Sequence, residues 1–202
     1  MLNWDSINPS DWSKALDKYN CYLISEEKAA RDARVTQTNR LRVTRMGIND
    51  FYEFLINDFL PWKYTDSRRL VRGKRLFSQN TNLEDLTNIK SRLCDPDLDD
   101  RTLLRTAMSI NGVGTAGASA LLSILYPERF GTADRFVVLC MQNAPSLISD
   151  TTIQHINPNA IKPKEVLYMF ELMRNKAVEL NKVSDANTWT PRMVDKAAWA
   201  DR

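Results

Sequence analysis

Glycine is concentrated in one short stretch of this chain, and that concentration constrains the fold more than any other feature. The chain of 202 residues contains 6 glycines, and four of them, Gly112, Gly114, Gly117 and Gly131, lie within twenty positions of one another. Gly112 and Gly114 separate two segments with helical periodicity, 99–108 and 116–125. Because glycine adopts a positive φ without steric cost, this pattern predicts a tight helix–hairpin–helix with backbone amides exposed at the start of the second helix.

Helical periodicity covers most of the remaining chain, and no segment has a convincing strand pattern. We expect a long helix over 11–33, a linker or exposed basic loop over 34–47, and a short helix over 50–60 that Pro61 ends. The other expected helices cover 66–78, 83–93, 99–108, 116–125, 135–141, 164–182 and 191 to the C-terminus. The predicted fold is all-α. It forms one helical unit over 1–202, with a core at 99–143 completed by N-terminal helices within 10–95 and C-terminal helices within 164–202.

Composition excludes several classes of protein. The longest wholly apolar run, Phe136–Met141, is far shorter than the roughly 20 residues of a membrane-spanning helix, and the N-terminus lacks the pattern of a signal peptide. Cys21, Cys94, Cys140 and His155 are widely separated, so they form no close-spaced metal motif. We therefore expect a cytoplasmic protein without metal or cofactor, associated with the nucleoid if bacterial.

Positive charge is concentrated in one region of a chain whose net charge is only +3. Residues 28–75 contain twelve Lys or Arg and five Asp or Glu, a local net charge of +7. Such a block suits a polyanion, because each Lys or Arg placed on a phosphate releases condensed counterions. The alternative is a solvated basic surface without a partner.

The hairpin sequence Ile110–Ala118, followed by Gly131-Thr-Ala-Asp134, resembles the signature of the helix–hairpin–helix DNA glycosylase superfamily, most nearly its 8-oxoguanine DNA glycosylase-like members. The matching residues lie within 104–140 and are Ile110, Gly112, Val113, Gly114, Ala118 and Asp134. The resemblance implies a glycosylase-like helical fold with a DNA groove. Its hairpin would bind a DNA phosphate through Gly112, Val113, Gly114, Thr115 and Ala116, although a plain turn between helices is the alternative.

The resemblance also implies a catalytic role for Asp134. This carboxylate would stabilise an oxocarbenium-like sugar and orient or deprotonate the water that attacks C1′. An aspartate preceding the apolar segment 135–141 is equally a standard N-cap, and the two roles are compatible.

Two departures from the family pattern affect what the resemblance implies. Ala116 stands where members with an amine nucleophile carry lysine, so the implied enzyme is monofunctional and leaves an abasic site in an intact strand. Asn111 replaces the usual proline, a change expected to loosen the turn without removing its amides.

Arginines supply further candidate phosphate contacts. Arg68, Arg72 and Arg75 fall at helical spacing on one face, and Arg135 directly follows Asp134. A solvated surface stripe is the alternative for the first three, and pairing with an acid is the alternative for Arg135.

The predicted function is a DNA glycosylase that hydrolyses the N-glycosidic bond of a damaged or modified base in duplex DNA after base flipping. A non-catalytic helix–hairpin–helix DNA-binding protein is the alternative, and a helical scaffold that has lost both roles is a third interpretation.

Overall fold

The structure is a computed structural model that describes residues 2–22, 25–184 and 188–200. Helices make up 72% of it, and the described residues contain no strand. The prediction of an all-α fold is therefore confirmed. The chain divides into two compact units, which we call the terminal unit (Met1–Ile24 and Pro127–Arg202) and the central unit (Ser25–Tyr126). The expected core at 99–143 contributes residues to both units.

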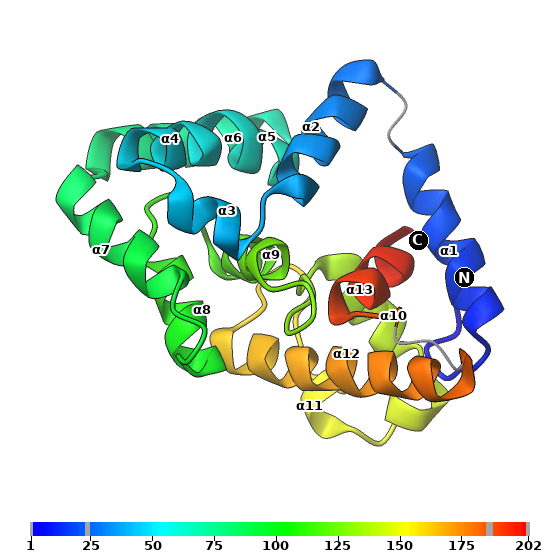
Figure 1. Ribbon diagram of the computed structural model, residues 1–202. Coiled ribbons are helices and arrows are strands. Elements are labelled where there is room, and N and C mark those ends of the chain that lie inside the picture. Colours follow the sequence, from blue (N-terminus) through cyan, green and yellow to red (C-terminus); the bar gives the residue numbers. More distant parts are fainter. Residues whose placement is uncertain (1, 23–24, 185–187, 201–202) are drawn as a thin grey trace. The chain divides into compact units, whose positions relative to one another are not determined.

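The central unit is a set of consecutive helices, of which the α-helices are labelled in Figure 1. They are α2 (Glu26–Gln37), α3 (Arg40–Arg45), α4 (Ile48–Glu53), the π-helix η1 (Phe54–Phe59), α5 (Leu60–Lys63), α6 (Ser67–Asn80), α7 (Leu83–Leu93), α8 (Asp100–Met108) and α9 (Thr115–Leu125). Helix α9 is buried at every position from Gly117 to Leu125, and it packs against α8. Just beyond α9, the Tyr126 hydroxyl donates a hydrogen bond of 2.8 Å to the Leu93 carbonyl of α7. The most apolar helix of this unit is thus fixed at both ends, by the hairpin and by α7.

The terminal unit joins the two ends of the sequence. Its helices are α1 (Pro9–Cys21), α10 (Arg135–Gln142), the 3-10 turn η2 (Pro145–Leu147), α11 (Thr151–Gln154), α12 (Pro163–Ser184) and α13 (Pro191–Ala200) (Figure 1). Helix α1 packs against α13 and also against α12. Trp12 of α1 is fully buried, and its ring lies 5.6 Å from that of Trp4 and 6.3 Å from that of Trp189. This tryptophan cluster packs residues from the N-terminal and C-terminal parts of the chain against one another.

The prediction of one long first helix was wrong. Helix α1 ends at Cys21, and α2 begins at Glu26 after Ser25, whose side chain accepts a hydrogen bond from the Lys28 amide. Residues 23 and 24, within the expected helix, lie outside the described residues. The N-cap at Ser25 starts a new helix, and the two helices belong to different units.

The segment 34–47 is also not the predicted basic loop. It contains the end of α2 and the whole of α3, whose N-cap Asn39 accepts a hydrogen bond from the Arg42 amide. Val35 and Val43 are fully buried, so apolar contacts fix this segment. Arg40 donates a hydrogen bond of 3.3 Å to the Cys94 carbonyl and lies over the Tyr126 ring, so its role in the fold is structural.

Pro61 does not end its helix as predicted. The helical chain continues from α4 through η1 into α5, and ends at Lys63. The Leu60 amide donates to the Leu55 carbonyl, a π-type bond that widens the turn directly before the proline. A widened turn accommodates the proline ring and its missing N–H.

The other predicted helices begin and end within two residues of the observed bounds, and residues 201 and 202 lie outside the described residues. Helix α11 and the turn η2 were not predicted from the sequence. None of the described helices is long and apolar enough to cross a membrane.

A buried aromatic on α6 allows a test of the central core. Phe77 is fully buried, and its ring lies 4.8 Å from that of Tyr52. Replacing Phe77 by Ala leaves a cavity and should lower the free energy of unfolding by about 3–5 kcal/mol. Val71 on the same helix is 67% exposed, so Val71→Ala should change it by less than about 0.5 kcal/mol. Denaturant unfolding of both variants checks this, and equal losses would contradict the assigned packing of α6.

Candidate functional site

The link between α8 and α9 forms a tight turn. The Val113 amide donates a hydrogen bond of 3.0 Å to the Ile110 carbonyl, which closes a four-residue turn. Gly112 has a φ of +81°, the left-handed conformation that glycine adopts without strain. Val113 is buried, whereas Gly114 is exposed and is the N-cap of α9. The predicted helix–hairpin–helix is therefore present as a local geometry in the central unit.

The hairpin lies directly on the backbone of α6. A Cβ atom at Gly112 would lie 2.3 Å from the Gly73 carbonyl oxygen, so no side chain fits between the two backbones. The Asn111 side chain donates a hydrogen bond of 2.7 Å to the Asn80 carbonyl at the end of the same helix. Asn111 thus fastens the turn to α6, where the sequence led us to expect a looser turn.

The Tyr64 hydroxyl lies beside the hairpin amides. It is 3.4 Å from the Gly112 carbonyl oxygen, to which it donates, and 3.4 Å from the Gly114 amide nitrogen, from which it accepts. Burial raises the pKa of Tyr64, against smaller opposing effects of the Gly114 amide and the charge of Arg69. A Cβ atom at Gly117 would lie 2.7 Å from this hydroxyl oxygen, so the third glycine of the cluster makes room for Tyr64.

The N-terminus of α9, which is the positive end of the helix dipole, has no side-chain cap. Gly114 has no side chain to cap the helix, and nothing lies within 4 Å of the position of its missing Cβ. Among the described residues, no acceptor bonds the amides of Thr115, Ala116 and Gly117. Free amides and the helix dipole together favour an anion at such an end.

The arginine on the hairpin side of α6 is not one of those predicted. Arg68, Arg72 and Arg75 are exposed, but Gly73, Phe77 and Asn80 form the hairpin side of α6 and the three arginines lie on another face. Arg69 is the arginine whose charge acts on Tyr64. It is exposed, and its guanidinium has no ion pair within the described part of the chain. The sequence did not predict the roles of Tyr64 and Arg69. Helical periodicity shows which residues share a face of a helix, but not which other segment packs against that face.

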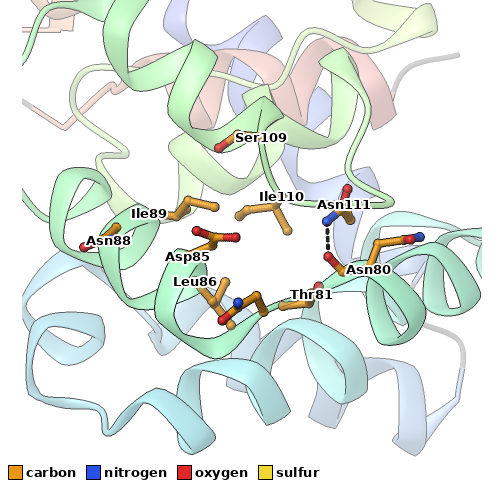
Figure 2. A pocket seen from close by; sticks show the side chains of 10 residues that line it. Asn80, Thr81, Asp85, Leu86, Asn88, Ile89, Ser109, Ile110 and Asn111 are labelled. Carbon is orange, nitrogen blue, oxygen red and sulfur yellow. Dashed lines mark hydrogen bonds between the residues drawn. The ribbon is translucent and has the colours of Figure 1, made fainter.

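A pocket of about 340 Å³ lies between the hairpin, the end of α6 and α7 (Figure 2). Seven of its ten lining residues have polar side chains, and Asn111 is hydrogen-bonded to Asn80. Its lining residues are Asn80, Thr81, Asn82, Asp85, Leu86, Asn88, Ile89, Ser109, Ile110 and Asn111. The lining includes the carboxylate of Asp85 and no Lys or Arg, so this pocket is unsuited to a phosphate.

Asp134 belongs to the terminal unit and is the N-cap of α10. Its Oδ1 atom accepts a hydrogen bond of 3.2 Å from the Phe136 amide, and its side chain is half-buried. Arg135 is exposed, with its guanidinium carbon 5.7 Å from the centre of the Phe136 ring. The capping interpretation of Asp134 is therefore confirmed.

The loop before Asp134 is held by a buried ion pair of α13. The Asp195 carboxylate accepts a hydrogen bond of 2.5 Å from the Thr132 amide, and Arg192 donates bonds of 2.6 Å to Asp195 and 3.0 Å to the Thr132 hydroxyl. Arg192 and Asp195 are 8% and 2% exposed. Burial raises the pKa of Asp195, and the charge of Arg192 opposes that rise. The sequence shows an Arg and an Asp three residues apart, but nothing in it indicates that both are buried.

In the part of the chain that the structure describes, no group of three or more His, Cys, Asp and Glu side chains is placed to hold a metal ion. Comparison of the chain with protein-family models, with curated proteins and with solved structures finds no match. The functional interpretation thus depends on the hairpin, on Asp134 and on the groups around them.

The hairpin glycines allow a matched pair of substitutions. Gly112→Ala combines a positive φ with a clash against the Gly73 carbonyl, and should lower the free energy of unfolding by about 2–5 kcal/mol. Gly114 has an extended backbone and open space, so Gly114→Ala should change it by less than about 1 kcal/mol. Thermal and denaturant unfolding of the two variants measures the difference. Equal stability would show that the hairpin does not pack on α6 as described.

Proposed function

We propose that the protein is a monofunctional DNA glycosylase, which hydrolyses the N-glycosidic bond of a damaged or modified base and leaves an abasic site. The observation that carries this proposal is the hairpin: Gly112 at positive φ, an exposed Gly114, and uncapped amides at the start of α9. Together with the resemblance of residues 104–140 to the glycosylase signature, this geometry favours a DNA phosphate as the anion.

Charge around the hairpin supports a nucleic-acid partner. Arg69 lies on the hairpin side of α6, and Arg68, Arg72 and Arg75 extend the positive surface along the same helix. Backbone amides and arginines that bind phosphates recognise the DNA backbone and not its sequence. The hairpin would therefore hold the duplex while other residues select the base.

Asp134 is the proposed catalytic residue. A hydrogen bond to the Phe136 amide orients its carboxylate, and a fixed, ionised carboxylate can stabilise an oxocarbenium-like sugar and orient the attacking water. Ala116 offers no amine to form a Schiff base with C1′, so water is the nucleophile in this proposal. Water as the nucleophile leaves the strand intact.

A non-catalytic DNA-binding protein is the second candidate. The observation that favours it is the cap itself, since the Asp134 side chain already stabilises α10 and needs no further role. The hairpin would then be the whole of the functional site.

Base release distinguishes the two candidates. Native protein should release a free base from one member of a panel of damaged and modified duplexes, detected by mass spectrometry, with strand breaks only after alkali. Asp134→Asn keeps a capping side chain but removes the charge, and should lower the release rate at least about 100-fold. Asp150, which caps α11 by accepting from the Ile153 amide, provides the control, and Asp150→Asn should release base at the native rate.

DNA binding without release from any substrate would favour the second candidate. Equal losses in Asp134→Asn and Asp150→Asn would assign the effect to capping. Strand cleavage without alkali would contradict a monofunctional mechanism.

Phosphate contacts are tested by the salt dependence of DNA binding. Arg69→Gln should weaken binding to any duplex sequence and reduce the slope of log K against log salt by about 1. Arg101→Gln, an exposed arginine at the end of α8 away from the hairpin, should leave the slope unchanged. Fluorescence anisotropy between 50 and 200 mM salt, roughly the range over which such contacts are lost, provides the measurement. A native slope in Arg69→Gln would remove this residue from the phosphate site.

A further inference from the structure

The loop that precedes Asp134 is attached to α12 and α13 along its length. The Pro127 carbonyl accepts from the Arg192 amide at 3.3 Å, and the Arg129 carbonyl accepts from the Arg174 side chain at 3.2 Å. The Phe130 ring packs 4.7 Å from that of Phe170. These contacts fix residues 127–130, so the loop reaches the Asp134 cap along a defined path.

Gly131 brings the loop close to both helices. A Cβ atom there would lie 2.5 Å from the Met173 sulfur and 2.6 Å from the Pro191 carbonyl oxygen. Its φ is not positive, so close approach, and not backbone conformation, accounts for this glycine. The fourth glycine of the cluster therefore serves the Asp134 loop, whereas the first three serve the hairpin.

Arg192 and Asp195 contact the loop at Thr132, two residues before Asp134. One Arg192 nitrogen donates to both carboxylate oxygens of Asp195, at 2.6 and 3.0 Å, and to the Thr132 hydroxyl. Asp195 in turn accepts from the Thr132 amide. Both groups of Thr132 that can hydrogen-bond on this side are thus held by one buried pair, two residues before Asp134.

Stability alone does not account for the burial of the Arg192–Asp195 ion pair. Two buried charges gain little stability over apolar side chains of similar size, because desolvation offsets their attraction. Such a pair has a geometric function when its hydrogen bonds fix the position of another group. Here the pair binds Thr132, and the Asp134 carboxylate that caps α10 follows two residues later.

We propose that Arg192 and Asp195 are positioning residues for Asp134, and that they fix the direction of its carboxylate through the backbone of Thr132 and Ala133. This inference rests on the proposed function where catalysis is concerned, whereas the anchoring itself is independent of it. Ala133 is fully buried, so a displacement at Thr132 is passed along a constrained backbone to Asp134.

The test uses Asp195→Asn in the intact chain with two readouts. Hydrogen exchange of the Thr132 and Phe136 amides, followed by NMR, should accelerate at least about ten-fold, because one amide loses its charged acceptor and the other depends on the Asp134 cap. The single-turnover rate of base release should fall about 100-fold, while the Kd for DNA changes less than about two-fold, because small displacements of reacting groups have effects of this size.

Glu179→Gln provides the matched control. Glu179 forms an ion pair with Lys176 at the same spacing on α12, and Lys176 lies against Trp4 and Trp12. Loss of this pair should lower stability without changing exchange at Thr132 or Phe136, or the release rate. If Asp195→Asn does not fold, Thr132→Val removes the hydroxyl that accepts from Arg192 but keeps the backbone amide, and should give a smaller effect in both readouts, with Thr132→Ser restoring native values.

Native exchange at Thr132 and Phe136 in a folded Asp195→Asn variant would overturn the anchoring. Faster exchange with a native release rate would overturn the positioning role alone. If the native protein releases no base, the proposed function fails, and the exchange measurement still decides whether this pair holds the loop.

Discussion

The central unit depends on the contact between two glycine backbones. Gly112 and Gly73 come so close that a single methyl group at the first would overlap the carbonyl of the second. Because of this close backbone contact, the turn packs directly on α6. Asn111 then hydrogen-bonds the end of that helix, and the Tyr64 hydroxyl lies beside the Gly114 amide. The amides at the start of α9 therefore follow a turn that is fixed by packing and hydrogen bonds, and not a flexible connection.

The sequence predicted the helical elements well where local signals agree. Segments 83–93 and 99–108 have N-cap residues, apolar periodicity and short connections, and their observed bounds match closely. The errors came where local signals conflict. Ser25 divides an apparently continuous periodic segment, Asn39 starts a helix within a basic run, and a π turn carries the chain through Pro61. The capping side chains of Ser25 and Asn39 set two of these helix starts, and burial of Val35, Val43 and Phe59 fixes the helices that result.

The sequence predicted the turn and the helix cap of the candidate site, but not the side chains that surround them. Glycine spacing identified the turn, and the residue before an apolar helix identified the cap at Asp134. Tyr64, Arg69, Arg192 and Asp195 come from segments far from these motifs, and one sequence carries no signal of which distant residues pack together. Periodicity correctly placed Arg68, Arg72 and Arg75 on one exposed face. It could not show that the hairpin packs on a different face of the same helix.

The terminal unit is formed by both ends of the chain, and this topology affects the order in which the two units can fold. Helix α1 packs against α12 and α13, so its partners are made more than a hundred residues later than α1 itself. The central unit, by contrast, is a single continuous stretch that is complete at Tyr126. During synthesis the central unit can therefore form first, while Trp12 and its neighbours stay without a core until α13 emerges. In chain order the central unit is inserted between the two halves of the terminal unit, so its two ends are the points at which the units could be separated or exchanged.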